Sequence, residues 1–134
     1  MGKDLQVMKE NKKSFGRFLK AFKYSFEGMR YAFYHEKNLI VMFLVSIIAV
    51  VLGMVLNVNY IETLVIILLI GIVISLEMVN TAIEAVVDLH DGDKKSKMGK
   101  VAQDSASGAV AFMSLISLIV GLMIFVPKII DLLK

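Results

Sequence analysis

The sequence has no cysteine, no tryptophan and only one proline among its 134 residues. Without cysteine, the chain can form neither a disulfide nor a thiolate metal site. The single proline, at position 127, leaves long stretches that can form uninterrupted helices. No Walker A motif and no glycine-rich loop of the protein kinase type is present, which excludes the familiar soluble nucleotide-binding folds.

Apolar residues, by contrast, make up 57% of the chain, and the mean hydropathy is +0.74. A soluble domain of this size keeps a large share of its residues at the surface and could not bury so many apolar side chains. A lipid bilayer is therefore the expected solvent. The first 38 residues lack the short apolar core of a cleavable signal peptide, so we expect none.

Three apolar runs follow one another along the chain, separated by polar residues at 57–60 and 90–100. The first and third contain 18 residues each, enough for a transmembrane helix, and the third ends before Pro127. The second run continues into a more polar helical segment. We expect an all-α membrane protein with spans at residues 39–56, 61–88 and 105–126.

The chain before the first span divides into two parts. Residues 1–13 are polar and charged, and we expect them to be flexible. In residues 14–36, phenylalanines together with Leu19 and Met29 recur at spacings of three and four, and lysines and arginines fill much of the remainder. This pattern predicts an amphipathic helix in the membrane interface, the alternative being a soluble helix packed on a partner.

The basic residues predict the orientation. Nine of the fifteen lysines and arginines precede the first span, four more lie in the loop at 89–108, and none lies at 57–60. By the positive-inside rule, we expect the N-terminus and the loop at 89–108 to be cytoplasmic.

The most informative segment is an acidic stripe at the end of the second span. In a helix, Glu84 and Asp88 lie within about 20° of Glu77, and Asn80 lies about 60° away, while the other faces stay apolar. We expect Tyr60, in the polar turn at 57–60, to lie at the outer membrane interface. Glu77 is 17 residues, or about 26 Å, further along the helix, and the hydrocarbon core is about 30 Å thick. Glu77 should therefore lie near the inner edge of the core, and Glu84 in the headgroup layer.

Three uses of this stripe compete. The carboxylates could hold Mg²⁺, one of them could act as a general base on a lipid hydroxyl, or they could pair with basic residues of neighbouring helices. Glu36 and Asp104 should lie at the same depth, amid thirteen basic residues. Acidic groups for a metal beside basic groups for phosphate favour phosphoryl transfer. His35 and His90 are interpreted as interfacial or loop residues, not as ligands.

Residues 77–88 also closely resemble a known signature, E-[IL]-[LIV]-N-[ST]-A-I-E-x-[VT]-[VI]-D, from which only Met78 departs. This segment resembles the small prokaryotic integral-membrane diacylglycerol kinases, a family that includes the undecaprenol kinases of Gram-positive bacteria. Arg17, residues 23–30 and Glu36 match the family's N-terminal pattern, and residues 104–110 match the start of its third span. The resemblance covers residues 15–126.

The resemblance implies homotrimers with active sites between subunits, three transmembrane helices and an interfacial helix. It implies ATP as phosphoryl donor and Mg²⁺ as cofactor. By position, Glu77 would be the general base. Glu36 and Glu84 would bind Mg²⁺ together with the ATP phosphates, and Asn80 and Asp88 would orient these groups. The nucleotide site would be lined by Arg17, Tyr24, Gln103 and Asp104.

Two departures from the family pattern matter. Gln103 stands where the family usually has a lysine expected to contact a phosphate, and glutamine donates a hydrogen bond without charge. Lys97 or Lys100 could compensate. The loop after Asp88 is one residue longer and lacks the family's usual Tyr-His pair.

We therefore expect an ATP- and Mg²⁺-dependent lipid kinase at the cytoplasmic face of the cell membrane. The basic N-terminus and the run 104–109 favour undecaprenol over diacylglycerol as the acceptor. The alternative is a non-catalytic assembly or regulatory protein that keeps the fold. An ion pathway fits poorly because the apolar runs carry no acidic group near the membrane centre, and no nucleic-acid partner is expected.

Overall fold

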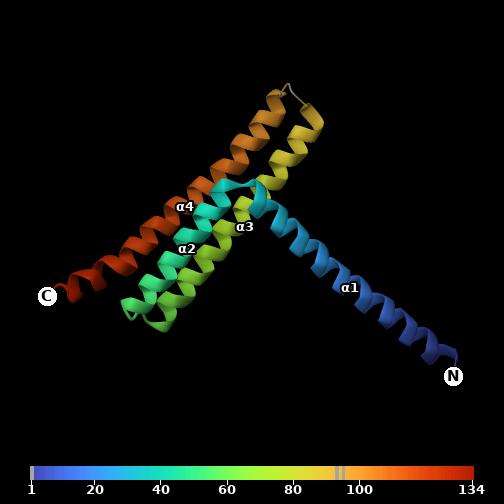
Figure 1. Ribbon diagram of the computed structural model, residues 1–134, viewed down its shortest axis with the longest axis horizontal. Coiled ribbons are helices and arrows are strands. Elements are labelled where there is room, and N and C mark those ends of the chain that lie inside the picture. Colours follow the sequence, from blue (N-terminus) through green and yellow to red (C-terminus); the bar gives the residue numbers. More distant parts are fainter. Residues whose placement is uncertain (1, 93, 95) are drawn as a thin grey trace. The chain divides into compact units, whose positions relative to one another are not determined.

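The computed structural model describes residues 2–92, 94 and 96–134, with side chains for residue 14 and from residue 16 onward. Within these ranges the chain forms four helices and no strand (Figure 1). They are α1 (Gly2–His35), α2 (Lys37–Val55), α3 (Tyr60–Asp91) and α4 (Lys97–Leu132). Helices α2, α3 and α4 are each long and apolar enough to cross a membrane, which confirms the predicted all-α membrane protein.

Helix α1 forms a unit of its own and is described by itself. It begins at Gly2, although a flexible segment at 1–13 and a helix start at Ser14 were expected from the sequence. The residues before Ser14 are mostly leucine, lysine, glutamate, glutamine and methionine, all good helix formers, and no proline interrupts them. Phe18, Phe22 and Phe26 are exposed along the helix, as its amphipathic pattern predicts.

The other unit runs from Glu36 to Lys134, and α3 packs against both α2 and α4 in it. The turn between α2 and α3 is tight. Asn57 adopts a left-handed conformation with φ of 49°, which asparagine tolerates better than most residues. Asn59 then caps α3. Its side-chain Oδ1 accepts from the backbone amide of Glu62 at 2.9 Å, and its own backbone amide donates to Glu62 Oε2 at 2.8 Å.

Helix α4 is longer than the third span predicted from the sequence. It begins at Lys97, eight residues before the expected start, and continues through Pro127 to Leu132. The third apolar run ends before Pro127, whereas the helix continues past it. A proline inside a helix removes one backbone hydrogen bond, but the next residue, Lys128, forms an ion pair of 2.9 Å with Glu62 and ties the last turns to α3.

Few apolar side chains of this unit are buried; they include Leu39, Ile66 and Val110. Large apolar residues are exposed along all three spans, as expected for surfaces that face lipid or other copies of the chain. Between α2, α3 and α4 lies an open apolar groove of about 570 Å³, whose lining includes Val41 and Val73.

Candidate active site

Helix α3 buries polar residues at its second half and exposes apolar ones there. Glu77 is 3% exposed and Asn80 6%, whereas Val79 and Val86 are exposed. Thr81, also buried, donates its hydroxyl to the Glu77 carbonyl oxygen at 3.0 Å. A helix that buries part of its polar stripe, here Glu77 and Asn80, is expected of a membrane protein that keeps ionisable groups for a function.

Asn80 links two parts of this stripe. Its Nδ2 donates to Glu84 Oε1 at 2.9 Å, one turn along the helix. Its Oδ1 is buried and has no hydrogen-bond partner among the residues that the structure describes. Leaving a buried acceptor unsatisfied costs free energy, so a donor or a cation is the natural partner for this oxygen.

The start of α2 supplies two further groups. Glu36 immediately precedes α2, and its charge acts on the Glu77 carboxyl together with that of Glu84. The Asn38 side chain hydrogen-bonds Glu77. Three carboxyl groups from two elements therefore lie close enough to interact, and their mutual repulsion favours a bound cation.

These residues also provide a test of whether Mg²⁺ fits. Among the described residues, no group of three or more His, Cys, Asp or Glu forms a site that could hold a metal ion. Mg²⁺ does not require such a cage, because it usually takes one or two carboxylates and completes its shell with waters and phosphates. Glu36 and Glu84 supply two such carboxylates, and the unsatisfied oxygen of Asn80, which hydrogen-bonds Glu84, can accept from a water bound to the ion, so the residues fit the ion.

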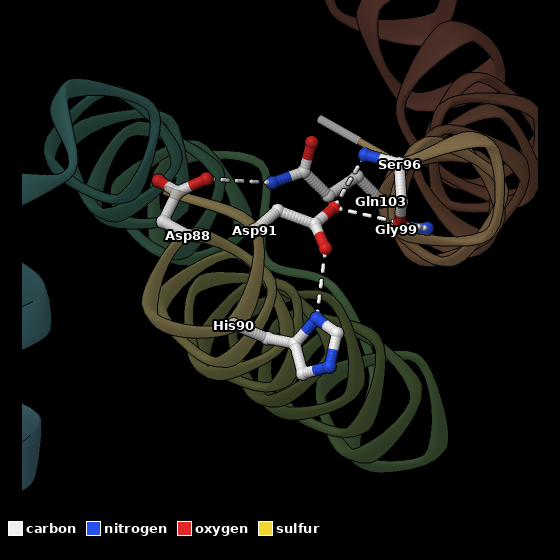
Figure 2. A network of polar contacts seen from close by, with 6 residues as sticks. All are labelled: Asp88, His90, Asp91, Ser96, Gly99 and Gln103. Carbon is white, nitrogen blue, oxygen red and sulfur yellow. Dashed lines mark hydrogen bonds and ion pairs between the residues drawn. The ribbon is translucent and has the colours of Figure 1, made fainter. Parts of the chain in front are cut away.

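Asp88 lies farther along the stripe and is held from α4. Gln103 Nε2 donates to Asp88 Oδ1 at 3.2 Å (Figure 2). Asp104 follows Gln103 and is exposed, and its carbonyl oxygen accepts from the Ser107 hydroxyl at 3.2 Å. Arg17 and Tyr24, the other predicted nucleotide residues, are exposed on α1, which is described separately.

The corner between α3 and α4 is built around Asp91. Its side chain, 4% exposed, accepts from the Ser96 amide at 2.7 Å and the Ser96 hydroxyl at 2.8 Å, and lies 2.8 Å from His90 Nδ1 (Figure 2). Ser96 Oγ in turn accepts from the Gly99 amide at 2.9 Å, which caps α4. A Cβ on Gly99 would run into Asp91 and Val87, so only glycine permits this close approach of the helices.

Some of these contacts were not predicted from the sequence. Asn38 could have been proposed as a site residue, because it is a polar side chain at the edge of an apolar run, two residues after Glu36. Gly92 and Gly99 flank the Asp91 corner, but glycines alone do not identify the carboxylate that they surround. The Gln103–Asp88 contact joins residues 15 positions apart and depends on how closely α3 and α4 approach.

The fold and the carboxylate cluster are those of a small integral-membrane protein that gathers ionisable groups on one of its spanning helices. Residues 23–125 match the sequence profile of the prokaryotic diacylglycerol kinases, and the chain belongs to that family. The resemblance seen in the acidic signature is thereby confirmed, as is the expected enzyme class, a lipid kinase of the membrane.

Three relatives illustrate the similarity. The chain is 38% identical to the undecaprenol kinase of Bacillus subtilis strain 168 over 120 residues, which cover 90% of this chain and 97% of the relative. It is 32% identical to the diacylglycerol kinase of Escherichia coli K12 over 112 residues, 84% of this chain and 91% of that one. The diacylglycerol kinase of Synechocystis is 32% identical over 114 residues, 85% of this chain but 65% of the longer relative.

Proposed function

We propose that this chain transfers the γ-phosphoryl group of ATP to the hydroxyl of undecaprenol, with Mg²⁺, at the cytoplasmic face of the cell membrane. The observation that carries the proposal is the buried carboxyl group of Glu77 beside Glu36 and Glu84. The choice of acceptor is supported by the 38% identity to an undecaprenol kinase over nearly its whole length, against 32% to two diacylglycerol kinases.

In the proposed reaction, Glu77 is the general base. Its carboxylate takes the proton of the lipid hydroxyl while the hydroxyl oxygen forms a bond to the γ-phosphorus. The bond between that phosphorus and the β–γ bridging oxygen breaks, ADP leaves with the bond's electron pair, and Glu77 then releases the proton to water. The hydrogen bond with Asn38 would hold the carboxyl group in one orientation for this step.

The other residues would bind and orient the nucleotide. Glu36 and Glu84 would hold Mg²⁺, which when bound neutralises negative charge on the phosphates. Asn80 would fix Glu84 through its hydrogen bond of 2.9 Å. We assign orientation of the reacting groups to Asp88 as well, and the nucleotide site to Arg17, Tyr24 and Asp104.

Access for a lipid is supported by the apolar groove between the three spans. Val73, which lines it on α3, is one turn before Glu77, and Val41 lines it near the start of α2. A hydrocarbon chain lying in this groove would bring its polar end towards Glu77.

We further propose that the active form is a homotrimer in which copies share active sites, with the N-terminus in the cytoplasm. The many exposed apolar side chains on α2, α3 and α4 support contact with lipid and with other copies. The thirteen basic residues before the first span and between the second and third support the orientation.

The test is transfer from labelled ATP by purified protein in detergent, with undecaprenol and diacylglycerol offered separately, with and without Mg²⁺. We expect labelled undecaprenyl phosphate only when Mg²⁺ is present, and slower labelling of diacylglycerol. Faster labelling of diacylglycerol would overturn the acceptor. If neither lipid is labelled and the protein does not bind ATP, the non-catalytic assembly role is correct.

A further inference from the structure

We propose that Gln103 is a positioning residue that holds Asp88 in its place on the acidic stripe, and that the corner around Asp91 keeps Gln103 in register. This inference rests on the proposed function, because it concerns how the carboxylates of that site are oriented. It assigns to Gln103 a contact within the protein, not a contact with the phosphates.

The first observation is the contact itself. Gln103 Nε2 lies 3.2 Å from Asp88 Oδ1, and the two side chains extend towards each other from α4 and α3 (Figure 2). An amide donates a hydrogen bond without adding positive charge, whereas a lysine at this position would form an ion pair. Gln103 can therefore orient Asp88 and leave the negative charge of the stripe unchanged.

The second observation is that the neighbouring carboxylate is held in the same way. Asn80 Nδ2 donates to Glu84 Oε1 at 2.9 Å from within α3. Two consecutive carboxylates of the stripe, Glu84 and Asp88, thus each accept from a neutral carboxamide. Such donors restrict the rotamers of the carboxylates, and reacting groups must be held to within about 0.5 Å of their working geometry.

The third observation is that the corner fixes where α4 begins. Asp91 binds the Ser96 amide and hydroxyl, and Ser96 caps α4 through the Gly99 amide. Gly99 lies against Asp91 and Val87, and Gln103 is four residues later, on the same face of α4. The contact of Gly99 with α3 therefore directs Gln103 towards Asp88.

A double-mutant cycle tests the inference. Wild type, Gln103→Leu, Asp88→Ala and the double variant are compared for kcat and for KM of ATP. We expect Gln103→Leu to lower kcat about tenfold with KM within about twofold, because one hydrogen bond to a charged group is lost. In the Asp88→Ala background the same change should have no further effect. Additive losses would overturn the inference, since they would mean that Gln103 acts independently of Asp88.

Two single variants sharpen the result. Gln103→Lys restores a phosphate-binding charge, so a lower KM for ATP would show that residue 103 contacts the nucleotide and would overturn the inference; we expect no decrease. Ser107→Ala is the matched control, since it removes a side-chain hydrogen bond that stays within α4. We expect its kcat to equal that of wild type, and a tenfold loss would mean that kcat reports general damage to α4.

Thermal unfolding of the same four proteins in detergent needs no substrate and separates the two proposals. We expect Gln103→Leu to lower the unfolding temperature of wild type but not that of Asp88→Ala. If wild type transfers no phosphate, the proposed function fails, and this cycle still decides whether the two residues are coupled. Equal decreases in both backgrounds would overturn the coupling.

Discussion

Helix α3 carries one glutamate in its first turn and another in its second half, and the surroundings of the two differ. Glu62 at one end forms an ion pair of 2.9 Å with Lys128 and a hydrogen bond of 2.8 Å with the Asn59 amide. Glu77, fifteen residues later, is buried beside two more carboxylates, Glu36 and Glu84, and takes a hydrogen bond from the neutral amide of Asn38.

We therefore interpret Glu62 as a carboxylate that stabilises the fold, and Glu77 as one that takes part in the proposed reaction. The charge of Glu62 is compensated by the chain itself, so this end of α3 is complete without a ligand. Gathering several carboxylates in a partly buried site is unfavourable unless something from outside the chain compensates their charge. The part of α3 that includes Glu77 is therefore where we propose that a cation binds, and the following variants test this contrast.

The largest effect is expected for Glu77→Gln. It removes the proposed base and leaves the size and polarity of the side chain nearly unchanged, so the rate of lipid phosphorylation should fall by about 10²- to 10⁴-fold. Transfer from labelled ATP measures the rate, and elution in size-exclusion chromatography should match wild type. An active Glu77→Gln enzyme would mean that another group takes the proton.

Asn80→Ala should weaken the use of Mg²⁺. It removes the donor that orients Glu84, and loss of such an outer-shell partner lowers metal affinity about 10- to 100-fold. Titration of activity with Mg²⁺ should show half-maximal rate at a correspondingly higher concentration, with much of the rate recovered at saturation. An unchanged titration curve would remove Asn80 from the metal site.

Gly99→Ala should separate α3 from α4 at the Asp91 corner. Its methyl group would collide with Asp91 and Val87, so we expect a lower unfolding temperature and a kcat reduced about tenfold, as for Gln103→Leu. Gly71→Ala is the control, because nothing lies within 4 Å of the added atom in the described structure. A stable and fully active Gly99→Ala protein would show that the close approach of the helices is not needed.

The smallest effect on catalysis is expected for Glu62→Gln. It breaks the ion pair with Lys128, so the unfolding temperature should fall, while kcat and KM should stay within about twofold of wild type because the change is remote from the carboxylate cluster. Lys128→Met should behave similarly. A large loss of kcat with unchanged stability in Glu62→Gln would contradict the assignment of a structural role to Glu62 and of a catalytic role to Glu77.

Much of this site was predictable because its residues share one helix. The spacing of Glu77, Glu84 and Asp88 places them on a single face whatever the tertiary structure is, and the apolar runs predict the spans. The continuation of α4 past Pro127 was not predicted from the sequence, for the opposite reason. Lys128 is held by Glu62, 66 residues earlier, and no local pattern contains that contact.

The contacts of the carboxylates with other elements were likewise not predictable. Asn38 meets Glu77, and Gln103 meets Asp88, only after α2 and α4 have packed against α3. Gln103 was interpreted from the sequence as a nucleotide contact without charge, because the sequence showed its departure from the family pattern but not which residue it contacts. In the structure it contacts Asp88.

The length of α3 has a consequence for the membranes in which the enzyme works. The helix has 32 residues, and about 26 Å separate Tyr60 from Glu77 along it, slightly less than the roughly 30 Å of an average hydrocarbon core. In the proposed orientation Tyr60 lies at the interface opposite the active site, so the length of α3 between Tyr60 and Glu77 determines how deep Glu77 lies in a bilayer of given thickness. A thicker membrane would leave Glu77 deeper than the lipid hydroxyl, and a thinner one would lift it towards the water. Turnover should therefore depend on the chain length of the surrounding lipids, even though those lipids take no part in the reaction.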